Sequence, residues 1–287
     1  MELYELSINL YEVRIMSNNK KDALGDRMKE NYENRSKTYL TRRTPCIIRL
    51  DGKAWHTFTR GFKRPFDKVL HEAMNDTVQY LCANIQGCKL GYTQSDEITL
   101  VLTDFDTITT DAWFGYSVQK MCSIAASMAT LAFNKALQKH SATFVEAVAA
   151  LQDFDTEKDY LVALQKAIDR GALFDARCFS VPESELVNAV LWRQQDATRN
   201  AIQMLGQTYF SHKQLDHKNT DQIQEMLFSQ KGINFNDMPT EFKRGVCCVR
   251  REIERNGAIR HAWIIDREIP IFSQKPEYIL GEIYKTK

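Results

Sequence analysis

A short apolar run that closes on an acidic turn is the first clear pattern along the chain. Residues 45–51 read Pro-Cys-Ile-Ile-Arg-Leu-Asp, and Gly52 follows. Such a run is typical of a buried strand that ends in a turn. Asp67 can then cap a helix that ends near Gly87, because apolar residues recur every three or four positions, at Leu70, Met74, Val78, Leu81 and Ile85. The pattern predicts a strand followed by an amphipathic helix.

The same alternation of element types repeats further along. Residues 88–92 and 98–102 are two β-prone runs, and the polar connection between them carries Asp96 and Glu97. They predict a β-hairpin. A second helix is expected from Asp111 to about His140. Further helix is expected over 142–170, with a charged break near residues 153–155 and an end at Gly171, before a strand over 173–181.

The predicted order is strand, helix, strand, strand, helix, strand, with 142–170 as a helical insertion. This order indicates an α+β fold of the ferredoxin-like βαββαβ type, with an antiparallel sheet and both helices on one face. We expect a weakly ordered extension over 1–33, in which Met16 could be a second start, a core domain over 34–181 and a helical, basic region over 182–287. Helices are expected near 186–205 and 221–228, before a β-prone tail.

Composition narrows the class of protein. With 287 residues, 44% of them hydrophobic, the chain can bury a sizeable core as one or two globular domains. It contains no apolar run near the roughly 20 residues that a membrane helix needs. The first eleven residues also lack the basic region of a signal peptide, so we expect a soluble, cytoplasmic protein. Seven cysteines without CxxC spacing argue against a disulfide framework and a zinc site.

Charge limits how a nucleic acid could be bound. The net charge is only +1, so a nucleic-acid partner would require a local basic patch. Residues 35–68 supply one, with ten Lys or Arg and two acidic residues, although a solvated face would look the same.

Acidic residues supply the candidate chemistry. The first strand and the hairpin are neighbours in the predicted sheet, so Asp51 can meet Asp96 and Glu97. Two carboxylates beside the carbonyl of Gly52 offer the oxygen ligands that Mg²⁺ prefers. Taken singly, Asp-Gly is a common turn and Ser-Asp-Glu a common polar loop. Their convergence on one sheet favours a site for two Mg²⁺ ions.

Groups suited to a triphosphate surround these carboxylates. The turn after Gly52 could present backbone N–H groups to phosphate oxygens, and Ser95 adds a hydroxyl. Lys63 and Arg64 can reach phosphate charge. The predicted nucleotide-binding residues of the turn are Lys53, Ala54, Trp55 and His56, of which His56 could equally be a core histidine. The chain lacks a GxxxxGK[ST] motif, which excludes an ordinary P-loop NTPase.

These motifs, taken in order, resemble those of the tRNA-His guanylyltransferase family of 3′-to-5′ polymerases. The resemblance covers roughly residues 22–250. The matching segments are Arg49-Leu-Asp-Gly-Lys-Ala-Trp-His56, Phe62-Lys-Arg-Pro65, Gln94-Ser-Asp-Glu97, Phe174-Asp-Ala-Arg177, Trp192-Arg-Gln-Gln-Asp196, Leu227-Phe-Ser229, Gly232-Ile-Asn-Phe-Asn236 and Lys243-Arg-Gly245.

The resemblance implies a palm-type catalytic domain, two Mg²⁺ ions, and ATP and GTP or other NTPs as substrates. The partner would be a tRNA, extended at its 5′ end, and the assembly a homo-tetramer. Asp51, Gly52 and Asp96 would bind metal, with Glu97 supporting catalysis. Arg64 and Lys120 would hold triphosphates. The implied RNA-binding residues are Arg193, Asp196, Asn200, Lys213, Asn234, Lys243 and Arg244.

Three departures from the family pattern point to one branch. Where members that add a single G to tRNA-His carry a His, this chain has Thr198; Ser117 replaces an Arg, and Ile223 a Lys. The combination resembles the bacterial-type branch, which fills in 5′-truncated tRNAs on a template. Single-G addition to tRNA-His is the alternative.

Two other functions remain open. A nucleotide cyclase would share the palm, but its Gly-Gly-Asp-Glu-Phe hairpin is Gln-Ser-Asp-Glu here. A non-catalytic RNA-binding module has no use for carboxylates beside a polyanion unless metal intervenes.

In the helix after Pro182, we expect Leu191 and Trp192 on the apolar side, with Arg193, Gln194 and Asp196 free for polar contact.

Overall fold

The structure, a computed structural model, describes residues 23–255 and 257–284. Among the described residues, 23–39 belong to one compact unit, and those from Leu40 onwards belong to another. The first contains α2 (Ala23–Met28), η1 (Lys29–Glu33) and η2 (Asn34–Ser36), none of which buries a residue. Residues 1–22 of the predicted weakly ordered extension, with Met16, lie outside the described residues.

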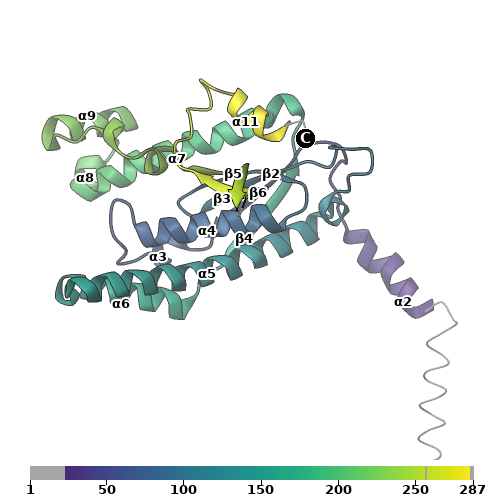
Figure 1. Cartoon of the computed structure of the whole chain (residues 1–287), viewed down its shortest axis with the longest axis horizontal. Coiled ribbons are helices and arrows are strands. Elements are labelled where there is room, and N and C mark those ends of the chain that lie inside the picture. Colours follow the sequence, from purple (N-terminus) through teal and green to yellow (C-terminus); the bar gives the residue numbers. More distant parts are fainter. Residues whose placement is uncertain (1–22, 256, 285–287) are drawn as a thin grey trace, which may run out of the picture. The chain divides into compact units, whose positions relative to one another are not determined.

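The second unit is built on one antiparallel sheet of six strands in the order β4-β1-β3-β2-β5-β6 (Figure 1). The predicted α+β class is confirmed, and β4-β1-β3-β2 is the order that a βαββαβ chain produces. The last two strands come from the region after Pro182 and lengthen the sheet at β2. The strands are β1 (Cys46–Gly52), β2 (Cys88–Gln94), β3 (Glu97–Leu102), β4 (Phe174–Ser180), β5 (Val246–Arg255) and β6 (Ala258–Asp266).

Two long helices, α4 (Lys68–Asn84) and α5 (Val118–Leu151), cover one face of the sheet, and α6 (Phe154–Arg170) packs against α5. As predicted, Asp67 caps α4, accepting a hydrogen bond from the backbone N–H of Leu70. Gly171 ends α6 with a positive φ of 68°.

The expected bounds of the second helix, Asp111 to about His140, are wrong at both ends. It begins only at Val118, because Phe114 and Gly115 in η3 (Trp113–Tyr116) adopt left-handed backbone angles. It then continues through residues expected to start a separate insertion, since Ser141 and Val148 keep the buried face in phase. Gln152, with a φ of 55°, ends it.

Helices from the second half of the chain cover the other face. The main one, α7 (Leu186–Tyr209), lies against residues such as Ile47 and Val101, which point away from α4 and α5. Neighbouring strand residues face opposite sides, so β1 buries Ile47 on one face and Ile48 on the other. The remaining elements are α3 (Trp55–Phe58), η4 (Glu183–Glu185), α8 (His212–Leu215), α9 (Thr220–Lys231), η5 (Phe235–Asp237), α10 (Thr240–Arg244) and α11 (Glu277–Ile283).

Two expectations from composition can be compared with the structure. All seven cysteines are free thiols. Among the described helices, none combines the length and apolar character needed to cross a membrane.

Candidate active site

The ends of β1 and of the β2–β3 hairpin bring the predicted carboxylates together. Asp51 lies opposite Glu97 in the β1–β3 register, and Ser95 and Asp96 form the hairpin turn. Gly52 makes the close approach possible: a Cβ there would lie 2.4 Å from the Trp55 ring and 2.9 Å from the Cβ of Asp96. A side chain at position 52 would therefore push the turn away from the strand.

The two carboxylates have little compensating positive charge. Burial raises the pKa of Asp96 to about 7, and the charge of Asp51 adds to the rise. The hydroxyl of Ser95 donates to Asp96 Oδ1 at 3.0 Å. Arg177 approaches Asp51 Oδ2 only to 3.9 Å and also contacts Asp175 at 3.4 Å. Carboxylates placed this way favour a bound cation.

The donor set fits Mg²⁺ rather than a metal that needs a protein cage. No group of three or more His, Cys, Asp or Glu side chains suited to a metal occurs in the described part of the chain. Mg²⁺ takes one or two carboxylates and completes its shell with water and substrate phosphate. Asp51, Asp96 and the adjacent Gly52 are the residues that could hold it.

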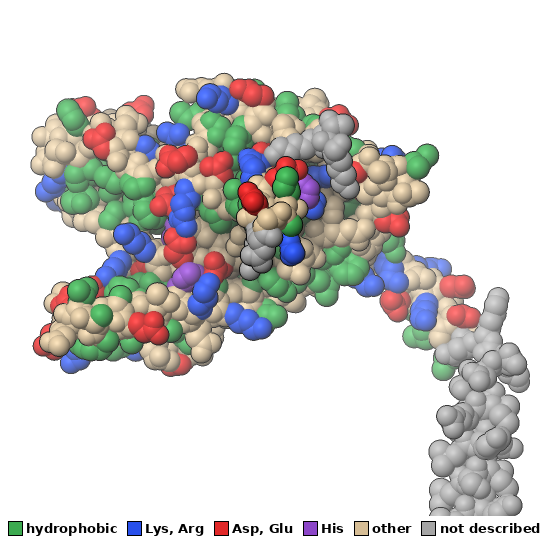
Figure 2. All heavy atoms as spheres, viewed as in Figure 1, with side chains coloured by type: hydrophobic (Ala, Val, Ile, Leu, Met, Phe, Trp, Pro, Cys, Tyr) green, Lys and Arg blue, Asp and Glu red, His purple; other side chains and the backbone are tan. Residues whose placement is uncertain are grey.

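A pocket of about 330 Å³ opens beside Asp96. In Figure 2 the surface is hollowed between the layer of α7–α9 and that of α3–α6, and charged side chains line the hollow. Six of the sequence-predicted residues line the pocket: Trp55, His56, Lys63, Arg64, Ser95 and Asp96. The opposite wall comes from α7 and α10 and was not predicted, because nothing local in the sequence links those helices to the hairpin; it contains Met204, Gln207, Glu241 and Phe242.

The turn after Gly52 is anchored by aromatic packing. The Trp55 ring stacks on Phe58 at 5.0 Å and also contacts Phe133 and Phe174. The backbone N–H of Lys53 donates to the carbonyl of Leu173 at 2.8 Å, so this N–H is already used. His56 is exposed, which rules out the alternative of a core histidine.

The loop that carries Lys63 and Arg64 is held from α6. Lys63 Nζ contacts Glu157 at 2.7 Å and lies over the rings of Phe144 and Tyr160. Asp67 accepts hydrogen bonds from the backbone N–H of Lys63 and from the Tyr160 hydroxyl, both at 2.9 Å. Arg64 lines the pocket and is exposed, so its guanidinium is accessible to an anion.

Lys120, the remaining predicted nucleotide-binding residue, does not line this pocket. It lies in the first turn of α5, with Nζ 5.4 Å from the centre of the Phe114 ring. At the site end of the sheet, α5 meets β4 through Thr130, which accepts from the N–H of Phe174. Ten helical residues, about 15 Å, separate Lys120 from Thr130.

In the segment Trp192–Asp196, the side chains expected to be buried and exposed are interchanged. Arg193 and Gln194 are buried, whereas Trp192 is 47% exposed. The phase explains the error: α7 buries Leu186, Val190, Arg193, Ala197 and Ala201, spaced three or four apart, and Trp192 falls outside this series. Gln194 fixes the later chain, donating to the carbonyl of Pro270 and accepting from the N–H of Phe272.

The other predicted RNA contacts separate into surface and internal groups. Asn200 and Lys213 are exposed, and Arg244 is partly exposed. Asn234 caps η5, accepting from the N–H of Asn236. Lys243 is only 8% exposed and donates to the carbonyl of Asn236 at 2.5 Å.

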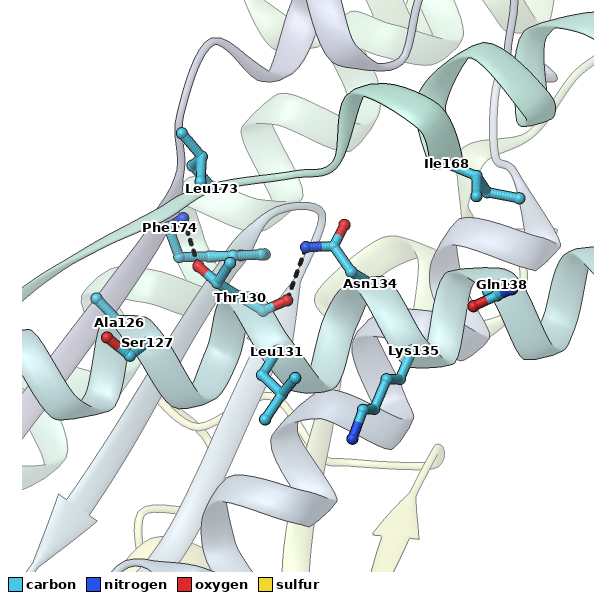
Figure 3. A pocket seen from close by; sticks show the side chains of 10 residues that line it. All are labelled: Ala126, Ser127, Thr130, Leu131, Asn134, Lys135, Gln138, Ile168, Leu173 and Phe174. Carbon is cyan, nitrogen blue, oxygen red and sulfur yellow. Dashed lines mark hydrogen bonds between the residues drawn. The ribbon is translucent and has the colours of Figure 1, made fainter.

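A second hollow, of about 620 Å³, lies along α5 and lacks the chemistry of the first (Figure 3). Its polar groups bond one another: Thr130 accepts from Phe174, and Asn134 bonds to the carbonyls of Thr130 and Ala172. Lys135 is its single charged lining residue. The pocket beside Asp96 therefore fits a charged substrate better.

The chain is similar to proteins of known family and structure. The family model described as tRNAHis guanylyltransferase matches residues 25–182. A bacterial tRNA(His) guanylyltransferase (Thg1)-like protein solved in complex with ATP is 38% identical, with a TM-score of 0.75 over 91% of this chain and 99% of that one. Another solved in complex with GTP is 36% identical, with a TM-score of 0.73 over 92% and 100%.

Among curated sequences, the tRNA(His) guanylyltransferase of Saccharomyces cerevisiae is 26% identical over 76% of this chain and 86% of its own length. Because the family model spans more than half of the chain, the protein belongs to the tRNAHis guanylyltransferase family of nucleotidyltransferases, as the motif resemblance implied.

Proposed function

We propose that this protein extends the 5′ end of truncated tRNA in the 3′-to-5′ direction, using the opposite strand as template. One observation carries the proposal: Asp51, Gly52 and Asp96 meet at one edge of the sheet, beside a pocket lined by His56, Lys63 and Arg64. The bacterial relatives of similar structure were solved with ATP and with GTP, which supports nucleotides as the pocket's ligands.

The proposed chemistry has two transfers. In the first, an oxygen of the RNA 5′ phosphate attacks the α-phosphorus of ATP, and pyrophosphate leaves. In the second, the 3′ hydroxyl of an incoming NTP attacks the activated 5′ phosphate, and AMP leaves. Two Mg²⁺ ions, when bound, would activate the attacking oxygen and stabilise the leaving group.

The chain's own residues would bind and orient these substrates. Asp51, Asp96 and the Gly52 carbonyl would hold the metal, and Glu97 would support the Asp96 turn. Arg64 would contact phosphate oxygens as a bidentate donor, while Lys63 would add a point charge if it left Glu157. His56 and Ser95 would complete the nucleotide contacts at the pocket wall.

At three positions this chain departs from the members that add a single G to tRNA-His. These departures support repair of truncated tRNA over the addition of a single G to tRNA-His. Each of these side chains is buried or hydrogen-bonded within the fold. Thr198 donates to the carbonyls of Gln194 and Lys243, Ile223 is buried in the α7–α9 core, and Ser117 is buried before α5. None presents the charge that His, Lys or Arg would offer a specific tRNA.

On this proposal, residues 34–181 carry out catalysis. Residues 182–287 contact the RNA and neighbouring subunits. The wall that α7 and α10 add to the pocket gives the second region a share in nucleotide binding. A homo-tetramer would supply more surface for a whole tRNA than one chain does. Small-angle scattering that showed a monomer at working concentration would contradict the tetramer.

A primer-extension assay tests the proposed function. The protein, a 5′-truncated tRNA, ATP, NTPs and Mg²⁺ should give an RNA lengthened at its 5′ end, in a sequence set by the template strand. Asp51→Asn and Asp96→Ala should abolish extension while the circular dichroism spectrum stays unchanged. If the wild type adds only one G, and only to tRNA-His, the repair role is wrong. If extension persists in Asp96→Ala, the metal site is wrong.

A further inference from the structure

We propose that Arg193 is a positioning residue for the metal site, holding the turn that carries Asp96 through an ion pair with Glu97. This inference rests on the proposed function, since it concerns the same site. It replaces the expected role of Arg193 in RNA contact, because a side chain that is 5% exposed cannot present its charge to a polyanion.

The ion pair joins elements that are far apart in the sequence. Arg193 Nη1 donates to Glu97 Oε2 at 2.5 Å, and Nη2 donates to Asp196 Oδ2 at 3.2 Å. The guanidinium also stacks on Trp192, with Cζ 3.7 Å from the ring centroid. Its planar fork therefore has two carboxylate partners and an aromatic cover, a geometry that lysine cannot reproduce.

Glu97 is the residue directly after Asp96 and the first residue of β3. Its backbone pairs with Asp51 on one side and with Gln94 on the other, so its position links the end of β1 to the hairpin turn that carries Asp96. With its carboxylate drawn toward α7, Glu97 is kept from joining Asp51 and Asp96 as a third ligand. The geometry thus leaves two carboxylates for metal and one for holding the turn.

Charge balance gives the pair a second consequence. The side chains of Asp51, Asp96 and Glu97 are all acidic and lie at the same edge of the sheet, and like charges at this spacing repel. Arg193 balances the charge of Glu97 from α7, and it does not line the pocket.

Binding without turnover tests this role. We would titrate each variant with a non-hydrolysable ATP analogue in Mg²⁺ and in EDTA, by calorimetry, and measure tRNA affinity separately. Arg193→Met should weaken the Mg²⁺-dependent part of analogue binding about tenfold, equivalent to about 1.4 kcal/mol. Arg193→Lys should recover part of this loss. Binding in EDTA and tRNA affinity should stay as in the wild type.

Arg199 provides the matched control. It lies on the same helix and contacts the other oxygen of Asp196 at 2.5 Å, but it is exposed and does not reach Glu97. Arg199→Met and Arg199→Lys should leave analogue binding unchanged. If Arg193→Met fails to fold, as judged by circular dichroism, the comparison of Arg193→Lys with Arg199→Lys decides.

Two results would overturn the inference: folded Arg193 variants that bind the analogue with Mg²⁺ as the wild type does, or a loss confined to tRNA affinity. Neither depends on extension of tRNA. A wild type that binds the analogue with Mg²⁺ but extends no RNA would refute the proposed function while leaving the positioning role testable.

Discussion

At the scale of single residues, strand order positions Asp51 and Asp96 at the sheet edge, whereas the phase of α7 positions Arg193 beside them. Asp51 and Asp96 follow from strand order alone, because neighbouring strands must bring their ends together. Arg193 was misplaced because a charged residue is normally exposed, and only the spacing of its buried neighbours on α7 marks it as inward. A phase count along 186–201 would have found it.

Gly52 offers a sharp test at this scale. Gly52→Ala would force a Cβ to within 2.4 Å of Trp55 and 2.9 Å of Asp96, displacing the turn from β1. Overpacking of this kind costs about 1–3 kcal/mol, and we expect extension activity to fall at least tenfold. Thermal denaturation and the extension assay measure the two effects. Gly281→Ala in α11, where nothing lies within 4 Å, should leave both unchanged or raise stability slightly. Equal behaviour of the two variants would contradict the close approach.

The side chain of His71 makes the stability of the folded protein depend on pH in the acid range. Burial lowers its pKa and outweighs the opposing effect of Glu241, which accepts from Nε2 at 2.9 Å, and of Glu72; Arg267 lowers it further. The folded pKa thus lies below the unfolded value of about 6.5, so the unfolded state takes up the proton first. The neutral form of His71 therefore stabilises the folded state fully above about pH 6.5. This stabilisation is lost as the pH falls through the folded pKa.

His71→Asn should therefore show a shallower fall in melting temperature between pH 7.5 and pH 5 than the wild type. Melting curves across that range, at constant ionic strength, make the comparison. Parallel curves for the two proteins would show that His71 does not carry the acid sensitivity.

At the scale of elements, the helices were predicted by type but their junctions were not. The start of α5 depends on the left-handed turn at Phe114 and Gly115, and its end on Gln152, neither of which has a strong local signal. The sequence pattern therefore predicts α6 as part of a helical insertion. Helix α6 instead supports the nucleotide loop through Tyr160 and Glu157.

Removing one hydroxyl tests that support. Tyr160→Phe deletes the hydrogen bond to Asp67, which also caps α4 and holds the N–H of Lys63. Loss of such a bond costs about 1 kcal/mol, and the loosened loop should raise the KM for ATP with little change in kcat. Tyr80→Phe, a change at an exposed position on α4, serves as the control. A KM that is unchanged in Tyr160→Phe would show that α6 does not order the loop.

At the scale of the molecule, the βαββαβ order and a β-prone tail were predicted, but the addition of that tail to the same sheet as two strands was not. The pairing of β5 with β2 joins Tyr92 to Cys247 and Gly91 to Cys248 across more than half of the chain. A sequence pattern reports the period of a strand but not its partner, and the run Val246–Val249 is apolar throughout. The continuous sheet is what places α10, just before β5, against the pocket.

This arrangement predicts opposite effects for two deletions. The described helices of 23–36 bury no residue, whereas Val246–Val249 is fully buried between β2 and β6. A chain that starts at Leu40 should keep a cooperative calorimetric transition, within a few degrees of the full chain, and should still bind the ATP analogue with Mg²⁺. A chain that ends at Gly245 exposes the edge of β2 and much of the second core, so it should lose that transition and the binding together. Loss of the transition in the first deletion, or its survival in the second, would mean that the folding unit is not the six-stranded sheet with its two helical layers.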